Sequence, residues 1–318
     1  MLLSIIVPVH NNKNTLSKCI NSLVQQKINS HDVEVIMVEN GSTDGSYELG
    51  KSISDRYDNV FLYKSENVGV SCARNVGLRH AKGDLIGFCD ADDYFKDDAF
   101  RKVIHIYNKL SADTIVVGIE KENSKNRGNT RRIKIVSGDE LIPHVLNDDN
   151  VMGSVCNKFY RREVIKDVLF NEGLSHCEDT YFNIQVLSTN KEARCALYLK
   201  PLYTYNPNPF SATRCVSGLF DCEDRLKYTV ACKHILKDFA LDKKEKRELG
   251  YAITRLSLEC ISEVYRSLDN KKWGNLLVDI RMNRSAYLIL FMKYVSMHRV
   301  KTLVLASVAM IRYGIHSA

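Results

Sequence analysis

GDLIGFCDADDYFKDD, residues 83–98, joins an apolar segment directly to a cluster of acidic side chains. The segment DLIGFC has the length and apolar character of a buried strand. Asp90, Asp92 and Asp93 follow it, and carboxylates this close together repel one another. The cluster therefore indicates either a turn that caps the next helix or a site that waits for a cation.

Strands and helices alternate through the rest of the first hundred residues. Continuous apolar runs rich in β-branched residues predict three further strands, at residues 2–9, 33–38 and 59–63. The intervening segments predict helices, at residues 16–24, within 43–57 and at 70–81. Because strands that alternate with helices over short turns are typical of a parallel sheet, we expect a Rossmann-like α/β fold with helices on both faces.

The alternation weakens after residue 100. Further strands are predicted at residues 114–119, 131–136 and 196–205, with helices near 102–110 and after 137. From about residue 216 the pattern is helical to the end of the chain. We therefore predict a mostly parallel α/β domain at 1–215, followed by a helical region at 216–318.

Charge and cysteine content restrict the class of protein. The net charge is +7, and residues 271–318 account for all of it with eight basic side chains and one acidic one. The ten cysteines show no zinc-site spacing, which favours buried thiols in a reducing compartment. The N-terminus lacks the basic start of a signal peptide, so we expect a cytoplasmic protein.

The basic C-terminal stretch also carries an apolar segment, residues 285–314. Lys293, Arg299 and Lys301 break it into runs near ten residues, whereas a membrane span needs about twenty. Two interpretations stay open. The segment is either a helix that packs on its own domain or an interfacial helix on an anionic membrane surface.

The acidic cluster fits one type of cation site better than others. An EF-hand loop starting at Asp90 would have Phe95 in place of the required Gly and Arg101 in place of the final Glu. A Mg²⁺ or Mn²⁺ site needs fewer protein ligands, because phosphate oxygens and water fill the remaining positions. A helix-capping turn stays the alternative.

Two further segments support a phosphate ligand. Glu39 and Asn40 follow the second predicted strand, and residues 66–75, ENVGVSCARN, provide a glycine, a helix start and Arg74. A helix N-terminus and a guanidinium both favour a diphosphate. Since ligands of parallel sheets bind beyond the carboxyl ends of the strands, these groups predict a pocket for a nucleoside diphosphate.

With these motifs in order, the chain resembles glycosyltransferase family 2, whose members have the GT-A fold. The matching stretches are SIIVPVHN, VENGSTDGS, NVGVSCARNVGLRHAKGDLIGFCDADD, CNKFYRREVI and EDTYF. They lie within about residues 1–215, and residues 216–318 match nothing general in the family. The resemblance implies a nucleotide-binding half at 1–95 and an acceptor half at 96–215. It also implies a metal-dependent, inverting transfer of a sugar from a nucleotide-sugar.

The resemblance assigns roles to individual residues. The donor nucleotide, most often a uridine nucleotide, would lie against Pro8, His10, Glu39, Asn67, Arg74 and Asp90. Arg74 would meet the diphosphate and Asp90 the ribose. The family usually has Asp where Glu39 stands, which leaves the identity of the base open. Asp92 would bind Mn²⁺ or Mg²⁺, with Asp93 in support.

The resemblance also places the acceptor chemistry. The catalytic base of the family lies in an acidic pair, here Glu178 and Asp179, and we expect Asp179 to take the proton of the acceptor hydroxyl. The alternative is that both acids only stabilise the first turn of a helix. Lys158 is a further candidate for contacts with phosphate or acceptor, and His176 for the acceptor site.

The leading hypothesis is a transferase that extends a bacterial surface glycan on a lipid carrier, on the inner face of the cell membrane. The partners expected are a nucleotide-sugar, a lipid-linked glycan and an anionic membrane, with no nucleic acid and with self-association open. A sugar-phosphate nucleotidyltransferase would need a glycine-rich loop after the first strand, and residues 8–18 contain no glycine. A non-catalytic nucleotide-sugar-binding partner is the third hypothesis, and the retained Asp92 and Asp179 argue against it.

Overall fold

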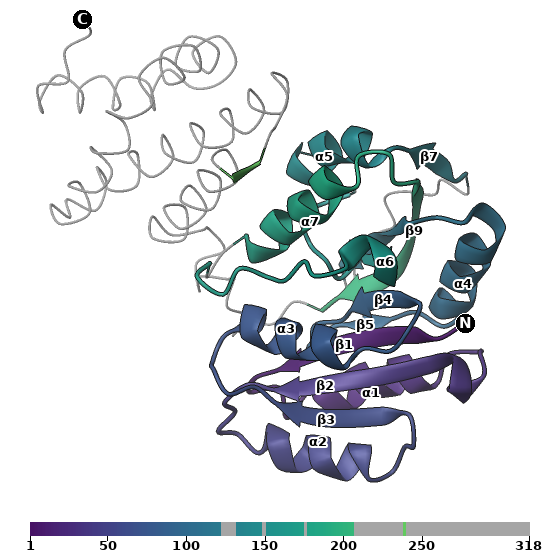
Figure 1. The fold of residues 1–318 in the computed structure, drawn as a ribbon. Helices are drawn as coiled ribbons and strands as arrows, with labels where there is room; N and C mark the ends of the chain where they lie inside the picture. Colours follow the sequence, from purple (N-terminus) through teal and green to yellow (C-terminus); the bar gives the residue numbers. More distant parts are fainter. Residues whose placement is uncertain (122–131, 148–150, 175–176, 207–237, 240–318) are drawn as a thin grey trace, which may run out of the picture. The chain divides into compact units, whose positions relative to one another are not determined.

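The computed structural model describes residues 1–121, 132–147, 151–174, 177–206 and 238–239 (Figure 1). The chain divides into two compact units, Met1–Asn208 and Pro209–Ala318. All elements below belong to the first unit. The predicted helical region at 216–318 lies outside the described residues apart from 238–239, so it and the predicted domain boundaries stay predictions.

The first half of the sheet has the predicted parallel strands. They are β1 (Leu3–Val9), β2 (Val33–Glu39), β3 (Val60–Lys64) and β4 (Leu85–Phe88). Their order in space is β3-β2-β1-β4, and all three pairings are parallel. Apart from Pro8, every residue of β1 is buried, and so is all of β2, as continuous apolar runs predict for strands covered on both faces.

Helices cover both faces of these strands. They are α1 (Leu16–Val24), α2 (Ser46–Ser54) and α3 (Val70–His80), and a short 3-10 turn, η1 (Ser30–Asp32), precedes β2. The first two helices contact each other, and α3 packs on β1 and β2 from the opposite face (Figure 1). A Cβ atom at Gly77 of α3 would lie 2.3 Å from Ile6 Cγ2, so only glycine allows the helix to approach β1 this closely.

The second half of the sheet is mixed. Its strands are β5 (Tyr94–Phe95), β6 (Thr114–Lys121), β7 (Lys134–Val136), β8 (Lys158–Arg161) and β9 (Cys195–Tyr205). Strand β8 lies antiparallel between β4 and β6, while β6 and β9 are parallel, and β5 and β7 pair antiparallel with β9. The α/β class is as predicted, but beyond β4 only the β6–β9 pair among the described strands is parallel.

The helices of this half are α4 (Ala99–Leu110), α5 (Gly138–Asn147), α6 (Arg162–Ile165) and α7 (Glu178–Thr189). An aromatic cluster in the core joins α7 to the sheet. Phe182 of α7 stacks on Phe170 with 4.1 Å between ring centroids, and Phe88 of β4 meets both rings edge-on. This packing fixes the start of α7 relative to the end of β4.

In the part of the chain that the structure describes, no helix is both long enough and apolar enough to span a membrane.

Candidate active site

The carboxyl ends of β1 and β2 meet the start of α3 through a set of short hydrogen bonds. The ring Nδ1 of His10 lies 2.7 Å from the carbonyl oxygen of Asn40. The Asn40 side chain is buried and accepts a hydrogen bond of 3.0 Å from the backbone N–H of Gly69, which precedes α3. The predicted proximity of these three segments is therefore present in the structure.

Glu39 organises the loop that follows β2. The residue is 7% exposed, and its carboxylate accepts a hydrogen bond from the backbone N–H of Ser42. Asn11, which follows β1, accepts from the backbone N–H of Thr43 at 2.8 Å. The longer side chain of Glu39 thus shapes the loop beside His10, at the place where the nucleotide base is predicted.

Arg74 lies at the centre of an acidic cage. Its Nη1 donates to Asp179 Oδ1 at 2.6 Å and to Glu178 Oε1 at 3.0 Å, and its Nη2 donates to Asp90 Oδ1 at 3.2 Å. Burial alone would lower the pKa of this guanidinium, but the three carboxylates more than offset that effect and raise it. In this structure the guanidinium of Arg74 contacts carboxylates, and its predicted contact with a diphosphate stays a prediction.

Asp179 lies in the first turn of α7, directly after Glu178. Its Oδ2 accepts a hydrogen bond of 3.2 Å from the backbone N–H of Val155, so both oxygens have a donor. Burial raises the pKa of the Asp179 carboxyl to about 7, although the charge of Arg74 opposes the rise. A carboxylate whose pKa lies near neutral pH is suited to accept a proton at that pH.

The three aspartates after β4 have different surroundings. Asp93 is 2% exposed, and its carboxylate accepts hydrogen bonds from the Tyr203 hydroxyl at 2.6 Å and from the Asn206 backbone N–H at 2.8 Å. Burial, and then the charge of Asp90, raises the pKa of Asp93 to about 8. Asp90 and Asp92 are more accessible, with 39% of the Asp90 side chain exposed. Asp93 therefore anchors the turn that presents the other two.

The donor set at this turn suits a hard divalent cation completed by a substrate. No group of three or more His, Cys, Asp or Glu side chains among the described residues could hold a metal alone. Asp92 is partly exposed and offers carboxylate oxygens as ligands, and the Asn206 amide donates to the Asp92 carbonyl oxygen at 3.1 Å, which holds the backbone in place. One or two carboxylates with substrate phosphates are the usual site for Mg²⁺.

Lys158 is fully buried, and its ammonium group binds backbone carbonyl oxygens inside the protein. Its Nζ donates to the carbonyl oxygens of Val151, Met152 and Ser154 and to Asn157 Oδ1, at 2.6–2.9 Å. Burial lowers the pKa of its ammonium to about 7, while the charge of Asp179 and the surrounding carbonyl oxygens favour the charged form. It holds the loop that presents the Val155 N–H to Asp179, so we do not assign it to phosphate or acceptor.

Replacing Lys158 by Met is expected to lower the free energy of unfolding by at least about 1–3 kcal/mol, because buried acceptor oxygens would lose their donor. Urea unfolding monitored by circular dichroism measures this loss. Lys109→Met, at an exposed position of α4, is the matched control and should stay within about 0.5 kcal/mol of the wild type. Equal stability of the two variants would contradict the anchoring role.

Three further residues were predicted to belong to the site: Pro8, Asn67 and His176. Pro8 is half-buried in β1, and Asn67 is exposed in the loop before α3. His176 lies outside the described residues, so its role stays a prediction. The contacts of Tyr203 and Asn206 with Asp93 were not predicted from the sequence, because they span more than a hundred residues.

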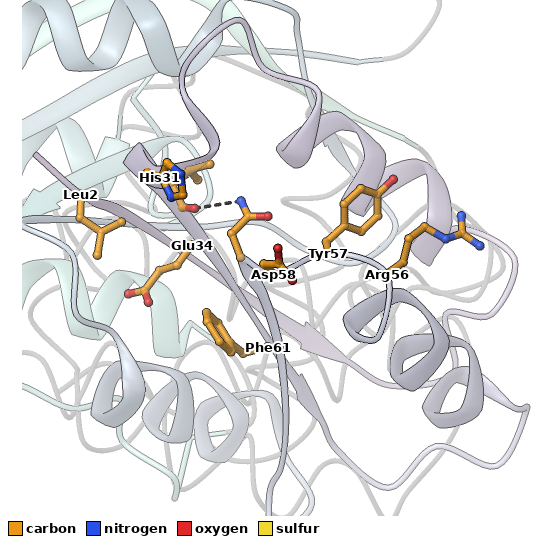
Figure 2. A pocket seen from close by; sticks show the side chains of 9 residues that line it. Leu2, His31, Glu34, Arg56, Tyr57, Asp58 and Phe61 are labelled. Atoms are coloured by element: carbon orange, nitrogen blue, oxygen red, sulfur yellow. Dashed lines mark hydrogen bonds between the residues drawn. The ribbon is translucent and has the colours of Figure 1, made fainter.

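A pocket also opens at the other end of the sheet, where β1, β2 and β3 begin (Figure 2). It has a volume of about 430 Å³, and Leu2, Val33 and Phe61 are among the residues that line it. The Asn59 amide donates to the Val33 carbonyl oxygen at 2.9 Å in its wall. None of the acidic cage residues lines this pocket, so the candidate active site is at the carboxyl ends of the strands.

Comparison with known proteins identifies the family. The model of glycosyl transferase family 2 matches residues 4–169, which is more than half of the chain. The chain belongs to glycosyltransferase family 2. The resemblance predicted from the sequence motifs is therefore confirmed.

A bacterial glycosyltransferase and two teichoic acid biosynthesis proteins are among the relatives. Glycosyltransferase EpsJ of Bacillus subtilis is 31% identical over 67% of the chain. The minor teichoic acid biosynthesis proteins GgaB and GgaA of the same organism are 28% and 31% identical over 59% and 64% of it. The chain covers 63% of EpsJ, 21% of GgaB and 47% of GgaA, so less than two thirds of each relative.

Solved structures of TarS and of a mannosyltransferase show the fold. TarS 1-349 of S. aureus in complex with UDP-GlcNAc superposes with a TM-score of 0.69 at 17% identity, covering 99% of this chain and 92% of that one. The mannosyltransferase PcManGT of Pyrobaculum calidifontis, in complex with GDP-Man and Mn²⁺, superposes at 0.56 with 13% identity, covering 99% and 81%. The predicted GT-A fold is confirmed.

Proposed function

We propose that the protein is an inverting glycosyltransferase that moves a sugar from a nucleotide-sugar, with a uridine-diphosphate sugar as the first candidate, to a hydroxyl group of a glycan. The observation that carries this proposal is the cage around Arg74. It joins Asp90, at the donor end of the sheet, to Asp179, the candidate base on α7, through hydrogen bonds of 3.2 and 2.6 Å. Donor and acceptor chemistry would therefore meet at one edge of the sheet.

The residues of the site have separate tasks in this mechanism. His10 and Glu39 would flank the base of the nucleotide and Asp90 its ribose. A divalent cation bound through Asp92 would supply charge stabilisation for the departing diphosphate. Asp179 would accept the proton of the acceptor hydroxyl while the oxygen of that hydroxyl forms a bond to sugar C1. The bond from C1 to the diphosphate oxygen breaks with its electron pair on the diphosphate, and a single displacement inverts the configuration at C1.

The relatives support a bacterial cell-surface acceptor. GgaA and GgaB are minor teichoic acid biosynthesis proteins, and TarS of Staphylococcus aureus, 25% identical over 60% of the chain, is a poly(ribitol-phosphate) β-N-acetylglucosaminyltransferase. A lipid-linked acceptor would fit the basic stretch at 271–318, which could attach the protein to the anionic inner face of the cell membrane. Those residues lie outside the described part of the chain, so this attachment rests on the sequence.

A panel of nucleotide-sugars tests the proposal directly. We expect one uridine-diphosphate sugar to raise the melting temperature in the presence of Mn²⁺ and to release UDP when a poly(ribitol-phosphate) or glycan oligomer is added. Release of pyrophosphate from a sugar phosphate and UTP would instead indicate a nucleotidyltransferase. Stabilisation by a nucleotide-sugar without any transfer or hydrolysis would indicate a non-catalytic binding partner.

A further inference from the structure

Arg74 connects the two halves of the glycosyltransferase domain at the site. It lies on α3, in the nucleotide-binding half, yet two of its three carboxylate partners, Glu178 and Asp179, begin α7 in the acceptor half. The third partner, Asp90, follows β4. One guanidinium thus contacts a predicted ribose ligand and the predicted base at the same time.

The surroundings of Arg74 leave it poorly placed to bind a diphosphate. Its side chain is 4% exposed, and the guanidinium carbon lies 5.3 Å from the centre of the Phe170 ring. The next residue of α3, Asn75, accepts from the Phe170 backbone N–H at 2.8 Å and donates to the Phe170 carbonyl oxygen at 3.0 Å. Two adjacent residues of α3 therefore hold the acceptor half: Arg74 binds Asp179, and Asn75 binds Phe170.

We infer that Arg74 is a positioning residue that orients the Asp179 carboxylate toward the acceptor hydroxyl, rather than a ligand of the diphosphate. This inference rests on the proposed function. Asp179 Oδ1 is held by Arg74 and Oδ2 by the Val155 N–H, so the plane of the carboxylate is defined from both sides. The planar fork of a guanidinium can serve Asp90 and Asp179 together, which the single ammonium group of a lysine does not reproduce.

The charge of Arg74 acts on the same carboxylate. The titratable groups that face Asp179 come from several elements: Arg74 of α3, Asp90 after β4, Cys156, Lys158 and Tyr160 in and before β8, and Glu178 of α7. The charge of Arg74 lowers the pKa of Asp179, whereas the charges of Glu178 and Asp90 raise it. Loss of the guanidinium would therefore raise the pKa of Asp179, and the base would lose its proton only at higher pH.

The test compares Arg74→Lys and Arg74→Gln with the matched controls Arg79→Lys and Arg79→Gln, in which an exposed arginine of the same helix is changed. UDP affinity with Mn²⁺ is measured by calorimetry, and kcat and KM for the nucleotide-sugar are measured from pH 5.5 to 9. We expect UDP affinity and donor KM of Arg74→Lys within about threefold of the wild type. Its kcat should fall about 10- to 100-fold, since small misplacements of a catalytic group cost that much.

Arg74→Gln tests the pH dependence of kcat, which would not change if Arg74 had only a structural role. We expect the acidic limb of its kcat profile to shift upward by about one pH unit or more, so that activity recovers in part at high pH. If this variant fails to fold in a thermal melt, the split between kcat and KM in Arg74→Lys still decides. The Arg79 variants should match the wild type in every measurement.

Two results would overturn the inference, and they differ from failure of the proposed function. A tenfold or larger loss of UDP affinity in Arg74→Lys with unchanged kcat would assign the guanidinium to the diphosphate. Wild-type kcat and pH profile in both Arg74 variants would remove any role in positioning. If the wild type itself turned over no nucleotide-sugar, the proposed function would fail first, and this inference with it.

Discussion

Replacing Asp179 by Asn is expected to slow sugar transfer about 10²- to 10⁴-fold, the usual contribution of a general base, while leaving UDP affinity unchanged. The amide oxygen can still accept hydrogen bonds from Arg74 and from the Val155 N–H, which the carboxylate accepts at 2.6 and 3.2 Å. An amide cannot take the proton of the acceptor hydroxyl. Transfer rates together with calorimetry on UDP binding measure both quantities.

Glu178→Gln is the informative partner of this variant. Glu178 lies beside Asp179 in the first turn of α7 and also accepts from Arg74, at 3.0 Å. If the two acids only stabilise the helix start, both variants should lose similar stability and similar activity. We expect instead a loss of less than about tenfold for Glu178→Gln, because one base suffices for the reaction. Weaker UDP binding or an unchanged rate in Asp179→Asn would remove Asp179 from the role of base.

The kcat of the wild type should also depend on this carboxyl. Because burial raises the pKa of Asp179 to about 7, the base is protonated below that pH and the rate should fall there. The same shift makes the folded state bind this proton more tightly than the unfolded chain does. Between the ordinary pKa of 3.8 and about 7 its contribution to stability therefore decreases as the pH rises.

Asp92→Asn is expected to lower turnover about 10³-fold or more at any Mn²⁺ concentration that supports the wild type. A bound cation supplies several kcal/mol of charge stabilisation, and each 1.4 kcal/mol is worth about a factor of ten in rate. Phosphate oxygens alone would not keep the cation in register with the protein. Turnover across a manganese series, and Mn²⁺ binding in the presence of UDP by electron paramagnetic resonance, measure the effect.

Asp97→Asn is the matched control for this prediction. Asp97 is an exposed acid five residues further along the chain, outside the turn that Asp93 anchors. It should retain wild-type turnover and Mn²⁺ binding. Wild-type activity of Asp92→Asn at low manganese would show that another group binds the cation.

The sequence predicted the first half of the fold well because local patterns decide it. The apolar runs of β1 and β2 are buried on both faces, so they lack alternation and are recognisable as parallel strands. The second half depends on pairings that no local pattern shows. Strand β5 has two residues, too few for any periodicity, and no local pattern shows that β8 lies antiparallel between β4 and β6.

The site was predicted in part for the same reason. The positions of Glu39, Asp90 and Asp179 follow from strand ends and a helix start, which the sequence shows. The partners that these groups bind in the folded protein cannot be predicted in this way. Arg74 meets Asp179 across 105 residues, and Tyr203 meets Asp93 across 110, so neither contact has a local signal. A buried arginine and a phosphate-binding arginine look alike in a sequence.

The adjacent anchors on α3 restrict how such a domain can diversify by recombination. Arg74 and Asn75 belong to the predicted nucleotide-binding half, but Arg74 binds Asp179, and Asn75 binds Phe170 and the Glu172 carboxylate, at 2.9 Å, in the predicted acceptor half. A chimaera that took its acceptor half from a relative would inherit the candidate base without the residues that hold this base, unless α3 came from the same relative. New acceptor specificities should therefore arise by exchange of loops between these anchors more readily than by exchange of whole halves.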